Sequence, residues 1–306
     1  MKFLVTGSNG LLGQKLIYRL LEKKYETIAF ALGPNRMKVQ TGYTYLNADI
    51  THKEQVHAAI EKNRPDVIIH SAAMTNVDAC ETEKEKCWAA NVLSVEHFIL
   101  AIKSVQAKNA QYNPHFIFLS TDFVFDGENG PYKEDDKPNP LSYYSNSKWE
   151  GEKRVIASGL KWSIARTIII YGIVDNMSRS NMVLWVKTSL EKGQSINVVD
   201  DQFRSPTLAE DLAEGCILIA EKEKTGIFHL SGPETKSIYD LAKDVAGFWK
   251  LDATLIKPIK TASLGQPAAR PPRTGFILDK ARKELGYSPK TFNQGLEFLK
   301  RQLAER

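Results

Sequence analysis

The sequence predicts an α/β protein in which a doubly wound parallel sheet is followed by a smaller, mostly helical C-terminal domain. Three observations lead to this fold class. Short apolar runs alternate with segments of helical spacing in the first half, two of these runs are apolar almost without interruption, and helical spacing dominates the second half. Alternation of this kind favours parallel strands joined by helical crossovers, and continuous apolar strands are typical of sheets buried on both faces.

The first half of the chain should contain five strands, most of them separated by helices. We expect the strands at residues 2–6, 27–32, 43–46, 66–70 and 116–120, and the helices at residues 11–21, 52–62 and 85–108. A polar loop at residues 126–139 then precedes one more helix, which begins near residue 144. Loops of this length in compact domains are usually functional.

The second half should form the smaller domain. Helical spacing is found at residues 182–190, 210–220, 238–249 and 292–303, and residues 265–273 are rich in proline and glycine. We therefore expect a domain at residues 1–165 and another at 166–306, partly interleaved with the first and forming the far wall of a cleft.

Composition and charge exclude several classes of protein. With 42% hydrophobic and 25% charged residues, the chain resembles an ordinary globular protein rather than a disordered one. The net charge of +5 is dispersed, and no basic tract with interleaved aromatic residues supports nucleic-acid binding. The N-terminal apolar run is too short for a signal peptide and no run spans a membrane, so we expect a cytoplasmic protein without membrane association. The cysteines, Cys80, Cys87 and Cys216, form no Cys-x-x-Cys pair and should be free thiols.

A glycine loop connects the first strand to the first helix. Gly7, Gly10 and Gly13 are spaced so that the first permits a tight turn, the second a close approach of backbone to a pyrophosphate, and the third close packing of helix on strand. The pyrophosphate would lie at the positive N-terminus of the helix. This arrangement predicts a Rossmann-type domain that binds a dinucleotide.

The end of the second strand bears on which dinucleotide binds. Residues 29–32 carry no carboxylate for an adenosine ribose, and Arg36 follows soon after. A cation at this place suits a 2′-phosphate, so we expect NADP, with NAD as the alternative. Arg36 as an ordinary solvated loop residue is the competing interpretation.

Tyr144 and Lys148 are the main candidates for catalysis. They are four residues apart and share one helix face, so the lysine ammonium should favour the tyrosinate and lower the pKa of the phenol from about 10. Thr121 directly follows the apolar strand at residues 116–120, at the strand end where open sheets place their chemistry, and its neighbour Ser120 is the alternative. A second Tyr-x-x-x-Lys match at Tyr239 lies in an ordinary amphipathic helix and indicates packing.

In order along the chain, these motifs resemble the extended short-chain dehydrogenase/reductase family. The resemblance rests on the glycine loop, on Asp49-Ile50, on residues 70–78, 91–92 and 120–127, and on the Tyr144 motif. Residues 131–140, 200–207 and 270–271 are similar to the dTDP-4-dehydrorhamnose reductases within that family. The resemblance implies NADPH-dependent reduction of the C4 ketone of dTDP-4-dehydro-L-rhamnose to dTDP-L-rhamnose, by a monomer or homodimer.

The resemblance also implies a role for each matching residue. Tyr144 would donate a proton to the sugar oxygen, Lys148 would bind the nicotinamide ribose, and Thr121 would bind the carbonyl. Asn91 would support the fold near the site or a water chain. The remaining cofactor-binding residues would be Gly7, Asn9, Gly10, Leu11, Leu12, Gly13, Arg36, Asp49, Ile50, Ala72, Ala73 and Met74. The substrate-binding residues would be Thr75, Asp122, Phe123, Arg204 and Arg270.

Three residues depart from the reductase pattern. Phe123 stands where a tyrosine is usual, and Arg204 stands where a glycine is usual, with a guanidinium suited to binding a diphosphate. Lys15 replaces a glutamate that takes part in a magnesium-bridged dimer in some relatives, so we expect no metal. Two other functions stay open: a non-catalytic regulatory subunit like that of methionine adenosyltransferase, and a different sugar-nucleotide reductase or epimerase.

Overall fold

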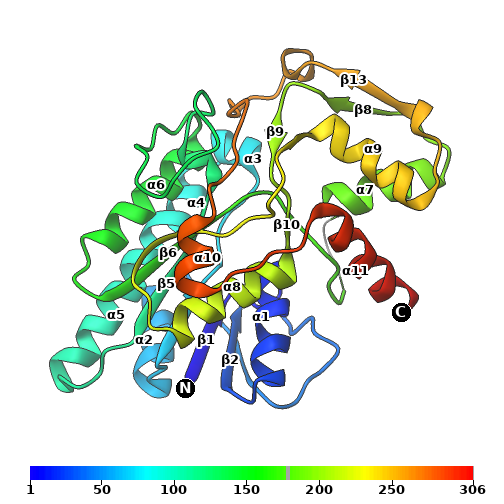
Figure 1. The fold of residues 1–306 in the computed structure, drawn as a ribbon. Coiled ribbons are helices and arrows are strands. Elements are labelled where there is room, and N and C mark those ends of the chain that lie inside the picture. Colours follow the sequence, from blue (N-terminus) through cyan, green and yellow to red (C-terminus); the bar gives the residue numbers. More distant parts are fainter. Residues whose placement is uncertain (177–179, 306) are drawn as a thin grey trace.

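The computed structural model describes residues 1–176 and 180–305, and a seven-stranded parallel sheet lies at its centre (Figure 1). The strand order is β11-β6-β5-β4-β1-β2-β3, and every neighbouring pair is parallel. The expected fold class is confirmed, because β3-β2-β1-β4-β5-β6 is the doubly wound order of dinucleotide-binding domains. The strands are β1 (Lys2–Thr6), β2 (Glu26–Ala31), β3 (Thr44–Asn47), β4 (Val67–His70), β5 (His115–Thr121), β6 (Lys161–Thr167) and β11 (Gly226–His229).

Helices cover both faces of the sheet and create two separate apolar cores. Successive side chains of a strand point to opposite faces, so Phe3 and Val5 of β1 lie in one core and Leu4 lies in the other. The first face packs against α1 (Leu11–Glu22), α8 (Ala209–Glu221) and α10 (Asp279–Leu285). The second face packs against α2 (Lys53–Asn63), α5 (Ser94–Lys108) and α6 (Tyr143–Ile156).

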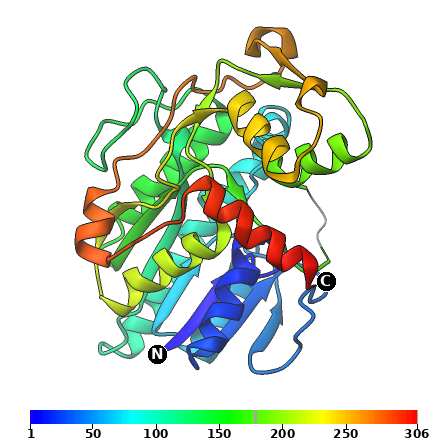
Figure 2. The same ribbon diagram turned by 45° about the vertical axis from the view of Figure 1, so that its right-hand side comes forward.

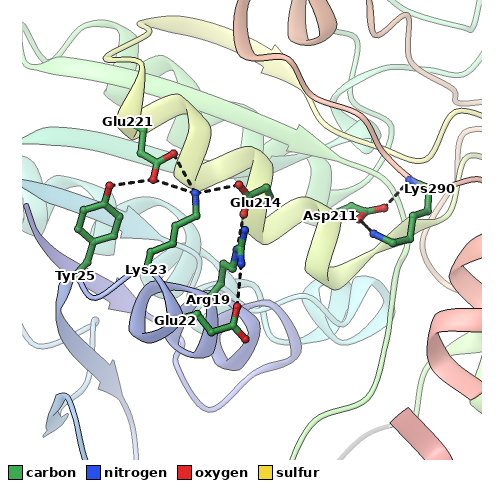
Figure 3. Close-up of polar contacts among 8 residues, drawn as sticks. All are labelled: Arg19, Glu22, Lys23, Tyr25, Asp211, Glu214, Glu221 and Lys290. Carbon is green, nitrogen blue, oxygen red and sulfur yellow. Dashed lines mark hydrogen bonds and ion pairs between the residues drawn. The ribbon is translucent and has the colours of Figure 1, made fainter. Parts of the chain in front are cut away.

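Polar contacts attach α8 to α1, although the two helices are far apart in the sequence (Figure 3). The ammonium of Lys23 lies 3.0 Å from both Glu214 and Glu221, and Nε of Arg19 donates to Glu214 at 2.7 Å. Tyr25 donates its hydroxyl proton to Glu221 at 2.9 Å. These groups are partly exposed, so each pair contributes little by itself, but together they align α8 on the face that α1 covers.

The helix expected at residues 85–108 is interrupted by one wide turn. The structure has α4 (Lys84–Trp88), the π-helical turn η1 (Ala89–Leu93) and α5 in continuous succession, preceded by α3 (Val77–Thr82). Asn91 lies in this turn, with its amide hydrogen-bonded to the backbone of Met74. Turns of this kind are frequent at functional sites, and apolar spacing does not reveal them.

The smaller lobe is mostly helical, as expected, and lies beyond the carboxyl ends of the strands (Figures 1 and 2). Its apolar core combines α7 (Met182–Glu191), α9 (Ile238–Trp249) and α11 (Phe292–Ala304) with the paired strands β8 (Ile196–Val199) and β13 (Ile256–Ile259). Two short strand pairs lie between the lobes: β7 (Ile170–Tyr171) with β10 (Thr207–Leu208), and β9 (Phe203–Arg204) with β12 (Lys236–Ser237). The single turn η2 (Asp122–Val124) follows β5, whereas η3 (Ala253–Leu255) and η4 (Thr261–Leu264) flank β13.

The chain passes between the lobes more than once. After α7, β8 and β9, it returns to the sheet through α8 and β11, and it then enters the smaller lobe again at α9. The division at residue 165 stays a prediction. Within the described part of the chain, no helix is both long and apolar enough to cross a bilayer.

Candidate active site

The parallel strands bring the predicted site residues to one edge of the sheet. β1, β4 and β5 are neighbours, so the segments that follow their carboxyl ends lie side by side at the lobe interface. A cavity of about 1370 Å³ opens there. Its lining includes every residue that we expected to react or to bind cofactor or substrate: Gly7, Asn9, Gly10, Leu11, Leu12, Gly13, Arg36, Asp49, Ile50, Ala72, Ala73, Met74, Thr75, Thr121, Asp122, Phe123, Tyr144, Lys148, Arg204 and Arg270. Their individual roles stay predictions.

The glycine loop has the shape that a pyrophosphate requires. Gly7 has a φ of +68°, in the left-handed region that favours glycine, and a Cβ at Gly13 would lie 2.2 Å from the carbonyl oxygen of Gly7. Helix α1 begins at Leu11, and no side chain caps its N-terminus at Gly10. Its first N–H groups are therefore available to an anion in the cavity, and this part of the site fits a dinucleotide.

Asn9 connects the glycine loop to the segment that carries Arg36. Its amide nitrogen donates to the carbonyl of Pro34 at 3.0 Å and to the hydroxyl of Tyr45 at 2.9 Å. Its amide oxygen accepts from the N–H of Arg36 at 3.0 Å. These bonds fix the backbone of Arg36, which also lines the cavity, within the segment that follows β2. This part of the cavity is where the adenosine ribose of a dinucleotide lies in such folds.

Tyr144 and Lys148 lie one turn apart at the start of α6, and Thr121 faces them from the end of β5. Burial raises the pKa of Tyr144 above its ordinary value, and a hydrogen bond with Thr121 acts in the opposite direction. Burial lowers the pKa of Lys148 to about 8, and the charge of Glu152 opposes this shift. At neutral pH the phenol therefore holds its proton and most of the lysine stays charged.

One expectation about this pair is wrong. We expected Lys148 to lower the pKa of Tyr144, but burial raises the pKa of this phenol, and Lys148 is not among the main causes of the shift. The reason is geometric. The ammonium of Lys148 lies over the ring of Phe118, 4.1 Å from its centre, and the phenol is buried among apolar groups. Desolvation of the phenolate dominates there.

Asn91 holds together two walls of the site. Its amide oxygen accepts from the N–H of Met74 at 2.8 Å, and its amide nitrogen donates to the carbonyl of Met74 at 3.1 Å and to Ser147 at 2.9 Å. Ser147 is adjacent to Lys148 in α6, and Met74 belongs to the segment after β4. The buried amide thus connects the two segments, and the role of Asn91 in the reaction stays a prediction.

His70 lies behind the site as a neutral, hydrogen-bonded side chain. Ser94 donates to the carbonyl of Ala90 at 2.6 Å, so it accepts from Nε2 of His70 at 3.3 Å. The hydroxyl of Thr6 then donates to Nδ1 at 3.0 Å. Burial, with the charge of Lys148 as the second cause, lowers the pKa of His70 to about 3. Both ring nitrogens are used inside the protein, which indicates a structural role.

The substrate side of the cavity contains a buried charge pair. Nε of Arg204 lies 3.9 Å from the carboxylate of Asp122, and both side chains are buried. The guanidinium also donates to the carbonyls of Phe203 and Pro271, each at 2.7 Å. The sequence pattern indicated that Arg204 could bind a diphosphate, but in this structure its donors already hold the backbone. The side chain fastens the loop at residues 271–272 to β9.

Arg270 extends from the same loop toward the other lobe. Its guanidinium binds both carboxylate oxygens of Asp78, at 2.7 and 3.1 Å. Asp78 lies in the first turn of α3, so this ion pair connects the two walls of the cleft.

Several lining residues were not predicted from the sequence. Most come from the smaller lobe or from loops: Lys86, Ser180, Asn181, Met182, Gln202, Leu264 and Gln266. Gln202 belongs to the segment at residues 200–207 that supported the resemblance, and membership in this segment is the sequence signal that could have identified Gln202 as a lining residue. The others lie in the cavity because distant segments pack together, and no local pattern marks them.

Comparison with known proteins agrees with this geometry. A family model described as RmlD substrate binding domain matches residues 1–304. The chain belongs to this family. The dTDP-4-dehydrorhamnose reductase of Aggregatibacter actinomycetemcomitans is 32% identical over 312 residues, 97% of each chain. The corresponding enzyme of Bacillus anthracis, solved in complex with NADP, has a TM-score of 0.83 and 27% identity over 99% of this chain and all of its own.

A second kind of relative has a different description. Methionine adenosyltransferase 2 subunit beta of Bos taurus is 30% identical over 295 residues, which cover 95% of this chain and 84% of that protein. The family and the fold expected from the sequence are confirmed. So is the expectation that the chain is an NAD(P)-dependent oxidoreductase related to dTDP-4-dehydrorhamnose reductases.

Proposed function

We propose that the protein reduces the C4 ketone of dTDP-4-dehydro-L-rhamnose to dTDP-L-rhamnose with NADPH. The observation that carries this proposal is the meeting of Thr121, Tyr144 and Lys148 in the cavity that the glycine loop opens into. The identity to the Aggregatibacter actinomycetemcomitans reductase supports the choice of substrate, since it extends over nearly the whole of both chains.

The residues around the glycine loop would hold NADPH, which supplies the hydride when it is bound. The uncapped N-terminus of α1 would receive the pyrophosphate, and Arg36 would receive the 2′-phosphate. No carboxylate stands at the end of β2, where an NAD-specific site holds one. The NADP bound to the related Bacillus anthracis enzyme also favours NADP over NAD.

Tyr144 would donate its proton to the oxygen of the reduced ketone. Its raised pKa keeps the proton on the phenol until negative charge develops on the substrate oxygen, so little is lost to solvent beforehand. Thr121 would donate a hydrogen bond to the same oxygen, and Lys148 would bind the ribose next to the nicotinamide. The protein thus supplies position, a proton and a polarising contact, while the cofactor carries the hydride.

The proposal is tested by following NADPH absorbance with the ketosugar nucleotide generated in situ. Oxidation of NADPH, with dTDP-rhamnose as the product, is the expected result. The corresponding UDP ketosugar and a dTDP sugar without a ketone serve as controls for the base and for the reaction. Turnover of the UDP compound alone would shift the assignment to another sugar-nucleotide reductase.

The second candidate is a regulatory subunit of methionine adenosyltransferase. The identity of 30% to the Bos taurus subunit beta favours it, over nearly the whole chain. Pull-down with purified methionine adenosyltransferase, in the presence of NADPH, separates the two functions. Stable capture without ketosugar reduction would replace the proposed activity.

A further inference from the structure

We propose that Asp78 is a positioning residue: it holds Arg270 by one edge of the guanidinium and leaves the second edge for the diphosphate of the sugar nucleotide. This inference rests on the function proposed above. It assigns a task to a carboxylate that takes no part in the hydride chemistry, and it explains why an acidic side chain stands beside a site for an anion.

The contact between the two residues is bidentate. Asp78 Oδ2 accepts from Nη2 of Arg270 at 2.7 Å, and Oδ1 accepts from Nη1 at 3.1 Å. Nη1 also donates to the carbonyl of Ala268 at 3.0 Å, and the N–H of Ala268 donates to Asp78 Oδ1 at 3.3 Å. Asp78 therefore holds both the side chain and the backbone of the loop.

The guanidinium of Arg270 has a second edge that these contacts do not use. A guanidinium carries five N–H groups, and the two at the Nε side form a fork of the same kind as the two at the end. Nε–H and the second proton of Nη2 have no acceptor among residues 1–176 and 180–305, and Arg270 lines the cavity. Two parallel N–H groups of an arginine match the oxygens of a phosphate.

The backbone after Arg270 is anchored independently of Asp78, because Arg204 donates to the carbonyl of Pro271 at 2.7 Å. Before Arg270, the nearest anchor is the N–H of Ala268, which donates to Asp78 itself at 3.3 Å. Without Asp78, the long side chain of Arg270 and the loop before it would both have more freedom. A bidentate carboxylate removes that freedom before the ligand arrives, which lowers the entropic cost of binding.

The alternative is that Asp78 competes with the substrate for the arginine. The two ideas predict opposite signs. Loss of a carboxylate beside an anion site should strengthen anion binding by electrostatics alone. If Asp78 positions Arg270, its loss should weaken binding in spite of the more favourable charge.

The test uses the full chain saturated with NADPH, so that the cofactor site is occupied, and calorimetric titration with dTDP and with inorganic pyrophosphate. Asp78→Asn should bind both probes about tenfold more weakly than the wild type, the effect of losing an ordered charge-assisted contact. The Kd for NADPH should not change. With substrate, KM should rise while kcat is retained, because a diphosphate contact is made equally in ground and transition states.

Asp244→Asn is the matched control. It also removes one carboxylate that pairs with a cation, Lys236 at 2.7 Å, and neither residue lines the cavity. Asp244→Asn should leave the Kd for dTDP and the Kd for pyrophosphate unchanged. Asp78→Glu keeps the charge and gives a second reading if Asp78→Asn folds poorly: its longer side chain moves the carboxylate and should weaken dTDP binding by a smaller factor.

Equal or tighter binding of dTDP by Asp78→Asn would overturn the positioning role while leaving the proposed function intact. If Asp78→Glu binds dTDP as tightly as the wild type does, the positioning role of Asp78 is likewise overturned. If the wild type binds neither probe, both the inference and the nucleotide-sugar function fail.

Discussion

The guanidinium of Arg204 lies over the ring of Phe123, 5.3 Å from its centre. These are two of the positions at which the sequence departs from the reductase pattern, and they lie in η2 and β9, which are far apart in the sequence. Arg204, which is much larger than the usual glycine, covers the ring of Phe123, which lacks the hydroxyl of the usual tyrosine. Phe123 in turn packs edge-on against Tyr144, with ring centres 6.2 Å apart. The two departures thus form one contact next to the predicted proton donor.

We expect Arg204 and Phe123 to be energetically coupled. A double-mutant cycle with Arg204→Met and Phe123→Leu, read by denaturant unfolding, should give a coupling of about 2 kcal/mol, as for a desolvated cation–π pair. The exposed Arg273, 5.1 Å from the ring centre of the half-buried Phe203, gives the matched control pair, which should couple by at most about 1 kcal/mol. Additive effects of Arg204→Met and Phe123→Leu would show that the contact between these two side chains contributes nothing to stability.

Arg204→Met alone should be strongly destabilising. It leaves the buried carboxylate of Asp122 without its cation, held by the hydroxyls of Thr121 and Thr274. It also leaves the carbonyl of Pro271 without its donor. Loss of one partner of a buried ion pair typically costs about 3–5 kcal/mol. Adding Asp122→Asn should restore part of this loss. Urea unfolding of the two single variants and the double variant measures how much stability is lost and restored. A double variant less stable than Arg204→Met would show that the unpaired carboxylate of Asp122 is not the cause of the loss.

Tyr144→Phe should abolish most turnover without disturbing the fold. Loss of a general acid lowers kcat by about 10² to 10⁴. The buried ring keeps its contact with Phe123, so the unfolding midpoint and the Kd for NADPH should stay at their wild-type values. Reduction of the ketosugar at the wild-type rate would exclude Tyr144 as the proton donor.

Arg36→Ala should reduce the preference for NADPH over NADH. Loss of a charged contact to the 2′-phosphate costs roughly 1.5–3 kcal/mol, or about ten- to a hundredfold in Kd. NADH binding should change little. Fluorescence titration of both nucleotides tests this, and equal affinities in the wild type would remove the reason for choosing NADPH.

Lys148→Met should stabilise the fold while it removes activity. In the unfolded chain a lysine has a pKa of about 10.4, and burial in the folded protein lowers that of Lys148 to about 8. Between these values the unfolded state binds more protons, so wild-type stability rises with pH across that window. Below pH 8 the wild type carries the full free-energy cost of burying the charged ammonium of Lys148. Lys148→Met should therefore be more stable than the wild type by an amount on the order of 2 kcal/mol.

The stability difference between Lys148→Met and the wild type should shrink as the pH rises from about 8 to about 10.4. Denaturant unfolding of both proteins at pH 7, 9 and 10.5 gives the comparison. A difference independent of pH would mean that the lysine charge is not the cause.

The amino-acid sequence by itself determined the order and type of most elements. Apolar periodicity placed β1 at its observed limits and α1 to within one residue of them, because a strand or helix that must bury one face repeats that requirement every few residues. The glycine loop and the Tyr144 motif were equally clear, because a tight turn or a shared helix face needs particular residues at short, fixed spacing. Two strands of the central sheet were missed: β11, which has four residues and is too short to show a period, and β6, whose sequence KWSIART is not a continuous apolar run.

Only the tertiary structure decided what surrounds each of these groups. The raised pKa of Tyr144 depends on burial, and burial comes from segments that are remote in the sequence. The partners of the two arginines show the same limit: Arg204 binds the carbonyl of a residue 67 positions later, and Arg270 binds Asp78, 192 positions earlier. Desolvation and long-range ion pairing depend on distances through space, whereas sequence spacing predicts only those contacts that the backbone geometry of one element enforces.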